Sequence, residues 1–194
     1  MKSAYLVLDL QNDLVHSDGP NGKGAFGLEA ARRDVLGRTA ATIRAARKAG
    51  ALIGFVRTGF SEDFRECPSN SPLFGAIRGY GLLKLGSWGA ESHPALPRAT
   101  GDLEIVKHRV SPFFGTALEL VLRAQGIQHV VCSGVSTQAV VQACVRDAHD
   151  RDFRVTVLEN CCSAQSEEEH RASIEALRMF AVIAASGEVF PSEE

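Results

Sequence analysis

Short runs of apolar, β-branched residues alternate along the chain with segments in which apolar positions recur every three to four residues. The short runs have the length and composition of buried strands, and the longer period is that of amphipathic helices. The pattern predicts six strands, at residues 4–10, 51–57, 103–107, 129–133, 154–158 and 181–185. It predicts four connecting helices, at residues 29–49, 116–125, 137–150 and 167–179. We therefore expect an α/β fold, a Rossmann-like three-layer sandwich with a central six-stranded, mainly parallel sheet flanked by helices.

Two glycines mark the ends of predicted helices. Gly50 follows the helix at 29–49, and Gly126 follows the helix at 116–125. Helices commonly end with a residue in the left-handed conformation, which glycine adopts without a steric penalty. We therefore expect a positive φ at both glycines.

The stretch from residue 58 to residue 102, called the excursion below, breaks the alternation of strands and helices. It is rich in Gly, Pro and Ser and only weakly periodic. Connections of this length in a compact domain are usually functional or disordered. Its larger apolar side chains favour a packed segment over a linker, with Trp88 in the core; they are Phe60, Phe64, Phe74, Tyr80 and Trp88. No repeat or domain boundary is evident, so we expect one domain over residues 1–194.

Composition and charge narrow the set of partners. The 194 residues are 45% hydrophobic and 23% charged, as in ordinary globular domains, and the formal net charge is −2. The charges are scattered, so we expect no binding to nucleic acid or to an anionic membrane. No apolar run approaches the roughly 20 residues of a membrane span, and the N-terminus lacks a signal-peptide pattern. The five cysteines have no paired spacing, which indicates a reducing cytoplasm.

Three candidate chemical groups follow predicted strands. In an open parallel sheet, ligands bind beyond the carboxyl ends of the strands. Asp9 ends the first strand, Lys107 ends the third, and the sequence GVSTQAV, called turn 134–140 below, follows the fourth. Taken alone, the carboxylate can equally be a helix cap or a structural group, and a lysine that ends a strand is more often solvated than catalytic.

Four motifs containing these groups occur in order along the chain. They are Asp9 with Gln11, Asn12 and Asp13; the WG-containing loop 87–96; Lys107 with Ser111, Phe113, Gly115 and Thr116; and turn 134–140. In this order they resemble the isochorismatase-like hydrolase superfamily, also known as the cysteine hydrolase family, over nearly the whole chain. The resemblance implies a hydrolase whose GVxTxxC turn normally supplies a cysteine nucleophile.

The last position of that turn departs from the family pattern. The residue that aligns with the nucleophilic cysteine is Val140, which has no nucleophilic atom. Cys144 lies one helical turn later, about 6 Å further along the helix axis, and we expect it to be a small buried hydrophobe. The thioester chemistry of the family's amidases therefore does not carry over to this chain.

The resemblance also bears on cofactors. The nicotinamidase branch of the family uses a DxHxxH metal site after the second strand, and here that region reads RTGFSEDFRECPSN, with acids but no histidine. The histidines elsewhere are dispersed. We therefore expect no metal and no other cofactor.

Cysteine-independent members of the family, the isochorismatases, imply a different chemistry, in which an aspartate is the general acid. Asp9 is expected to serve as this acid, or as a base that activates water. Lys107 is expected to orient Asp9 and to stabilise developing charge, and the backbone N–H groups of Ser136 and Val140 to bind an anionic oxygen. Two alternatives stay open: a ligand-binding relative that has lost the nucleophile, and an amide hydrolase that uses Ser136 or Thr137.

Side chains near these groups suggest a small, partly apolar substrate with a carboxylate, bound in a pocket with one cationic wall. The residues expected to line this pocket are Gln11, Arg57, Phe60, Phe114 and Thr137. Family members are commonly oligomeric, and the excursion offers apolar surface, so we also expect a homo-oligomer, a dimer or a tetramer.

Overall fold

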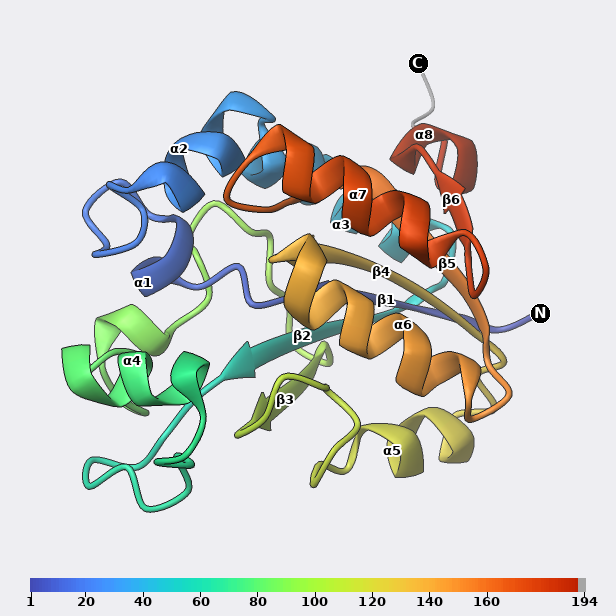
Figure 1. The fold of residues 1–194 in the computed structure, drawn as a ribbon. Helices are drawn as coiled ribbons and strands as arrows, with labels where there is room; N and C mark the ends of the chain where they lie inside the picture. The colour runs from blue at the N-terminus through green and yellow to red at the C-terminus, as the bar shows by residue number, and fades with distance from the viewer. Residues whose placement is uncertain (192–194) are drawn as a thin grey trace.

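The computed structural model describes residues 1–191, which form a six-stranded sheet with all neighbouring strands parallel (Figure 1). The strands are β1 (Ser3–Leu8), β2 (Leu52–Thr58), β3 (Leu103–Lys107), β4 (His129–Val135), β5 (Arg154–Ser163) and β6 (Val182–Ala184). Their order across the sheet is β3-β2-β1-β4-β5-β6. The predicted α/β fold is confirmed. Because the chain changes direction across the sheet between β1 and β4, the switch point of the sheet lies at their carboxyl ends.

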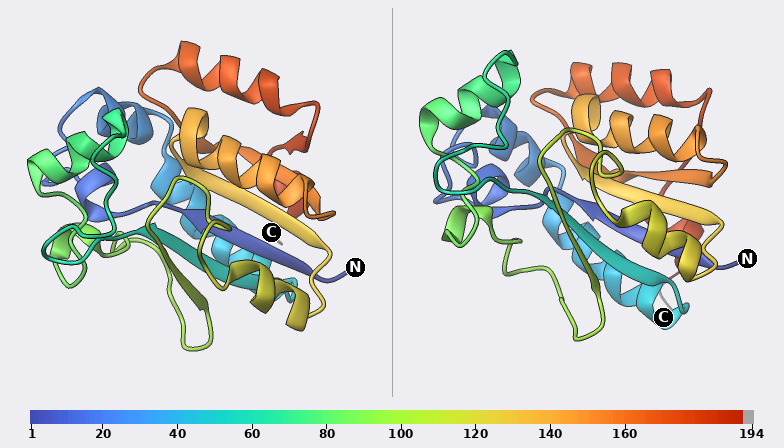
Figure 2. Two further views of the ribbon diagram at one scale, coloured as in Figure 1. Left: turned by 60° about the horizontal axis from the view of Figure 1, so that its bottom comes forward. Right: turned by 90° about the horizontal axis from the view of Figure 1, so that it is seen from below.

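Helices cover both faces of the sheet. Helix α3 (Val35–Lys48) packs on one face, whereas α5 (Leu118–Ala124), α6 (Gln142–His149) and α7 (Glu167–Leu177) pack on the other. Figure 2 shows α6 and α7 opposite α3 across the strands. Strand β1 is buried on both sides because its residues alternate between the two cores: Tyr5 and Val7 face α3, and Leu6 and Leu8 face α5 and α6.

Glycines end two helices as expected, but two predicted helices are each divided. Gly50 and Gly126 have φ of 77° and 69°, so the positive φ predicted there is confirmed. The helix predicted at 29–49 is α2 (Ala25–Arg32) followed by α3, because Asp34 adopts φ of 50° between them. The helix predicted at 137–150 begins with a π-helical turn, η2 (Thr137–Val141), before α6.

The excursion folds as a packed unit beside the carboxyl ends of β1 and β2. It contains α4 (Pro72–Tyr80) and a short 3₁₀ helix, η1 (Trp88–Ala90). Phe60, Phe64 and Phe74 form a small core with neighbouring apolar residues, which confirms the packed segment. The prediction for Trp88 is wrong: the residue is 51% exposed, and its ring lies edge-on to His16, with 4.9 Å between the ring centroids.

Three consecutive side chains after Asp9, here called the QND clamp (Gln11, Asn12 and Asp13), tie the excursion to the sheet. The Gln11 amide donates to the carbonyls of Thr58 and Ala90 and accepts from the Thr58 N–H, each at 2.8 Å. The Asn12 amide donates to the Trp88 carbonyl, and the Asp13 carboxylate accepts from the Leu83 N–H, both also at 2.8 Å. All three clamp residues are buried. The clamp thus fixes the start of the excursion and its residues 83–90 next to the end of β1.

Two further helices complete the described part of the chain, α1 (Asn12–Val15) and α8 (Ser186–Val189). Within residues 1–191, none of the helices combines the length and the apolar character that crossing a membrane requires.

Candidate active site

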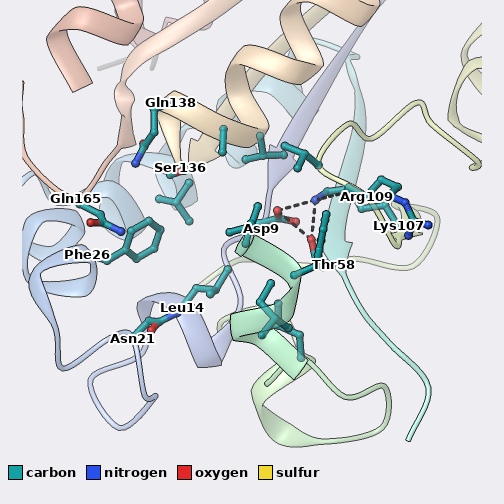
Figure 3. A pocket seen from close by; sticks show the side chains of 18 residues that line it. Asp9, Leu14, Asn21, Phe26, Thr58, Lys107, Arg109, Ser136, Gln138 and Gln165 are labelled. Carbon is teal, nitrogen blue, oxygen red and sulfur yellow. Dashed lines mark hydrogen bonds and ion pairs between the residues drawn. The ribbon is translucent and has the colours of Figure 1, made fainter. Parts of the chain in front are cut away.

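A cavity of about 350 Å³ opens at the carboxyl ends of β1 to β4, next to the switch point of the sheet (Figure 3). Asp9, Thr58 and Lys107, which lie at the ends of β1, β2 and β3, line the cavity together with turn 134–140. Two of the three candidate groups that sequence analysis placed at strand ends, Asp9 and Lys107, therefore lie side by side. The third, the turn after β4, faces the same space.

Asp9, Thr58 and Lys107 form one hydrogen-bonded cluster. The Lys107 ammonium donates to Asp9 Oδ2 at 2.8 Å, to Thr58 Oγ1 at 2.6 Å and to the Arg109 carbonyl at 3.2 Å. An ammonium has three N–H groups, so these acceptors satisfy it. The Thr58 hydroxyl in turn donates to Asp9 Oδ2 at 3.2 Å. Lys107 is only 1% exposed, which excludes the solvated lysine that its residue type alone would suggest.

The pKa of the Asp9 carboxyl is raised. Burial raises the pKa of the Asp9 carboxyl, and the neighbouring Lys107 and Thr58 oppose that rise. Among the described residues, Asp9 Oδ1 has no hydrogen-bond partner, while Oδ2 receives both Lys107 and Thr58. One carboxyl oxygen is therefore fixed by the protein. The other is buried and has no hydrogen-bond partner among the described residues.

Turn 134–140 forms the opposite wall. Gly134 adopts φ of 135°, and a Cβ there would lie 2.0 Å from the Leu8 carbonyl oxygen, so only glycine fits between β4 and β1. The Val135–Ser136 peptide bond is cis. Ser136 and Val140 both line the cavity, and Val140 is 2% exposed. Val140 thus contributes an inert isopropyl group to this wall of the cavity.

The remaining walls are mostly apolar. Helix α4 of the excursion supplies three of the apolar side chains that line them. The full set is Leu14, Phe26, Leu73, Phe74, Ile77, Leu83 and Val110. Amide side chains add hydrogen-bonding groups, and in Figure 3 Gln138 and Gln165 lie near Phe26, on the side of the cavity away from Lys107. The cavity therefore suits a small, partly apolar molecule that carries polar groups.

The five residues expected to shape the pocket lie outside the cavity lining. Gln11 belongs to the QND clamp, Phe60 is in the core of the excursion, and Phe114 is 63% exposed. Arg57 pairs instead with Glu91 and Glu104, at 2.9 Å and 3.7 Å. Thr137 is buried beneath the turn. The cationic wall expected from Arg57 is thus directed elsewhere.

Thr58 is the site residue that sequence analysis missed. Successive side chains of a strand point to opposite sides, so Arg57 and Thr58 cannot both face the cavity. In the sheet Thr58 is the register partner of Lys107, whereas Arg57 pairs with Val106. A strand-end threonine in register with the strand-end lysine is the signal that would have identified it.

The cysteines lie away from the cavity. All five are buried, and in Cys132 a hydrogen bond with Cys144, together with burial, raises the thiol pKa. Cys144 is fully buried on α6, as predicted for a packing residue. Within residues 1–191, no group of three or more His, Cys, Asp or Glu side chains is placed to hold a metal ion.

Comparison with known proteins assigns the class. The isochorismatase domain family model matches residues 3–188, so the chain belongs to the isochorismatase family, and the superfamily that the motifs resemble is confirmed. Family membership together with amidohydrolase relatives places the chain among the hydrolases of this family.

Individual relatives support the same assignment. The isochorismatase family protein YecD of Escherichia coli O157:H7 is 34% identical over 89% of this chain and 85% of its own length. The ureidoacrylate amidohydrolase RutB of Variovorax paradoxus is 30% identical over 81% of this chain and 67% of its own. The N-carbamoylsarcosine amidase of Thermoplasma acidophilum has a similar structure, with a TM-score of 0.78, 27% identity, and coverage of 96% and 97% of the two chains.

Proposed function

We propose that this protein hydrolyses a small molecule with water, through Asp9 and Lys107 and without a cysteine nucleophile. The observation that carries the proposal is the pairing of a buried Asp9–Lys107 cluster with Val140 across one cavity. In this proposal Val140 stands where the amidases of the family have their cysteine. No cysteine lines the cavity among the described residues, which supports a mechanism without a thiol.

Asp9 can carry the reaction by either of two routes. As an acid, the protonated carboxyl gives its proton to the substrate, water adds to the resulting cation, and a proton returns to Asp9; the adduct then breaks its carbon–oxygen bond to release two products. As a base, the carboxylate removes a proton from water as the water oxygen adds to a carbonyl carbon; the tetrahedral adduct then expels the leaving group, which takes this proton from Asp9. In that route the backbone N–H groups of Ser136 and Val140 would stabilise the negative charge on the carbonyl oxygen. Lys107 holds Asp9 in place in both routes.

An amide hydrolase with a hydroxyl nucleophile is the second candidate, and one observation favours it. Ser136 lines the cavity, and RutB, to which this chain is similar, is an amidohydrolase. Thr137 is a poorer choice of nucleophile because it is fully buried and lies outside the cavity lining. The two candidates differ in their need for the Ser136 side chain.

A substrate screen combined with alkylation tests the proposal. Purified protein would be assayed against vinyl ethers, amides, ureides and esters, before and after treatment with iodoacetamide. We expect turnover of one class, unchanged by the reagent and retained in Cys144→Ala, because the mechanism uses no thiol. Loss of activity in step with modification of Cys144 would contradict the proposal.

Other outcomes of the screen assign the alternatives. A loss of about 10³-fold or more in Ser136→Ala would indicate a hydroxyl nucleophile. Ligands that raise the melting temperature, with no turnover in any class, would indicate a ligand-binding relative.

The pH dependence of kcat/KM should distinguish the acid route from the base route. Burial raises the pKa of Asp9, so the acid route predicts full activity below that pKa and a loss as the pH rises through it. The base route predicts the opposite, with full activity above the pKa of Asp9 and a loss as the pH falls through it. In both routes Thr58→Val should move the limb to higher pH, because the Thr58 hydrogen bond lowers the pKa of Asp9. A limb that stays fixed in Thr58→Val would show that another group titrates.

A further inference from the structure

A partly buried hydrogen-bond chain runs from turn 134–140 through α7 and β5 to the end of α2. The Thr137 hydroxyl lies 2.9 Å from Nδ1 of His170 on α7, and His170 Nε2 lies 2.7 Å from Oε1 of Glu159 on β5. Arg33, at the end of α2, donates to the same Glu159 oxygen at 2.6 Å and to the Cys162 carbonyl at 2.9 Å. Thr137 and His170 are fully buried. None of these residues lines the cavity, so the mechanism above leaves the chain unexplained.

The hydrogen-bond partners of His170 determine which of its ring nitrogens carries a proton. The Glu159 carboxylate only accepts, so His170 Nε2 carries the proton that it donates to Glu159. Burial lowers the pKa of His170, which favours the neutral ring, although Glu159 opposes this shift. In the neutral ring Nδ1 is then an acceptor, and the Thr137 hydroxyl donates to it. The chain therefore has one consistent direction, from Thr137 through His170 to Glu159.

This sequence of hydroxyl, imidazole and carboxylate is also the order of a nucleophile, its base and the orienting acid. The Thr137 hydroxyl cannot have that role here, because a substrate in the cavity cannot reach it. A nucleophile must reach the substrate, and the Thr137 hydroxyl is fully buried on the side of the turn away from the cavity lining. The chain is better suited to hold Thr137 than to activate it.

Helix α7 holds the turn at two adjacent points. His170 binds Thr137, and the preceding residue of α7, Glu169, accepts from the Gln138 amide at 3.3 Å. Thr137 is flanked by Ser136 and Gln138, both of which line the cavity. A shift of Thr137 would therefore move the cavity wall on both sides of it, including the N–H groups assigned above to a developing negative charge.

We propose that His170 is a positioning residue, which fixes turn 134–140 through the Thr137 hydroxyl so that the backbone N–H groups of the turn face the reacting atoms. The inference rests on the proposed function. Interactions that act only on charge developing in the transition state change kcat more than KM. Loss of the Thr137–His170 hydrogen bond should accordingly lower kcat and leave KM nearly unchanged.

The decisive experiment compares two substitutions at each end of this hydrogen bond. Thr137→Val removes the hydroxyl at constant shape, and Thr137→Ser keeps it. In His170→Gln the side-chain amide lies near the former Nε2 position, so the hydrogen bond to Thr137 is lost. In His170→Asn the amide lies near the former Nδ1 position, so the hydrogen bond to Thr137 is kept. We expect Thr137→Val and His170→Gln to lower kcat by about 10- to 100-fold with KM within about threefold, and Thr137→Ser and His170→Asn to retain most of kcat.

A second measurement does not depend on turnover of the native protein. In a Val140→Cys background, the rate of alkylation of residue 140 reports the geometry of the turn, because nearby N–H groups favour the thiolate. Thr137→Val should slow this rate severalfold and Thr137→Ser should not. If the parent thiol does not react, hydrogen exchange of the amides of residues 136–141 replaces it as the measurement, with faster exchange expected only in Thr137→Val.

The outcomes separate the inference from the proposed function. Equal kcat and equal alkylation rates in Thr137→Val and Thr137→Ser would overturn the positioning role while leaving the hydrolase intact. Absence of any turnover, with the alkylation difference present, would overturn the hydrolase and retain the held turn. If Thr137→Val does not fold, His170→Gln against His170→Asn supplies the same comparison.

Discussion

Asp9→Asn is expected to lower kcat/KM by about 10²–10⁴-fold, the usual contribution of a positioned general acid or base. Asparagine has the shape of aspartate, so its oxygen can still accept from Lys107, and its NH₂ takes the place of Oδ1, which has no partner among the described residues. The change keeps the shape of the side chain and removes its exchangeable proton and its negative charge. Turnover and thermal unfolding would be measured on the same preparation.

Stability needs a control because Asp9→Asn leaves the Lys107 ammonium buried without a counter-charge. Removing one partner of a buried ion pair costs up to about 3–5 kcal/mol, whereas replacing both partners by neutral groups is often tolerated. The double variant Asp9→Asn with Lys107→Met should therefore recover stability and remain inactive. Full turnover in Asp9→Asn would remove Asp9 from the mechanism.

Val140→Cys is expected to create a thiol that is alkylated about tenfold faster, or more, than any native cysteine. The first turn of the following helix and the Lys107 cation both favour a thiolate at this place, which lowers the pKa of the new thiol. Burial has the opposite effect on native thiols, raising the pKa of Cys161 and Cys162. Intact mass and peptide mapping after a timed exposure to iodoacetamide would give the rate at each cysteine.

The matched control for this variant is Ala139→Cys. Ala139 lines the same cavity one residue earlier, so it tests whether access alone makes a thiol reactive. Comparable rates at residues 139 and 140 would mean that the turn does not activate a nucleophile at residue 140. An inert thiol at residue 140 would weaken the view that Val140 stands in the nucleophile's place.

The fold could be predicted from the sequence because its information is local. Five-residue apolar runs and a helical period are visible in short windows, and Gly50 and Gly126 mark helix ends by the backbone conformation that they alone adopt easily. The division of the helix predicted at 29–49 could not be seen, because Asp34 in the left-handed conformation carries no signal in the apolar period.

The site was predicted only where it depends on strand ends. Asp9 and Lys107 meet because parallel strands bring their carboxyl ends to one edge. The choice between Arg57 and Thr58 depends on which face of β2 turns to the cavity, which requires the register with β3. The apolar wall from α4 depends on how the excursion packs, and no local pattern encodes that.

The QND clamp also bears on how the substrate range of such a protein can be altered. Gln11, Asn12 and Asp13 hold the excursion through main-chain carbonyl and N–H groups, which every residue except proline provides in full. Within the held segment, Gly89 alone is constrained by the clamp's own side chains, since a Cβ there would lie 2.1 Å from Asp13 Oδ1. Within residues 61–81, side chains outside the core formed by Phe64, Cys67 and Phe74 can therefore be exchanged, including Leu73 on the α4 wall of the cavity, while the anchoring contacts and the Asp9–Lys107 cluster keep their places.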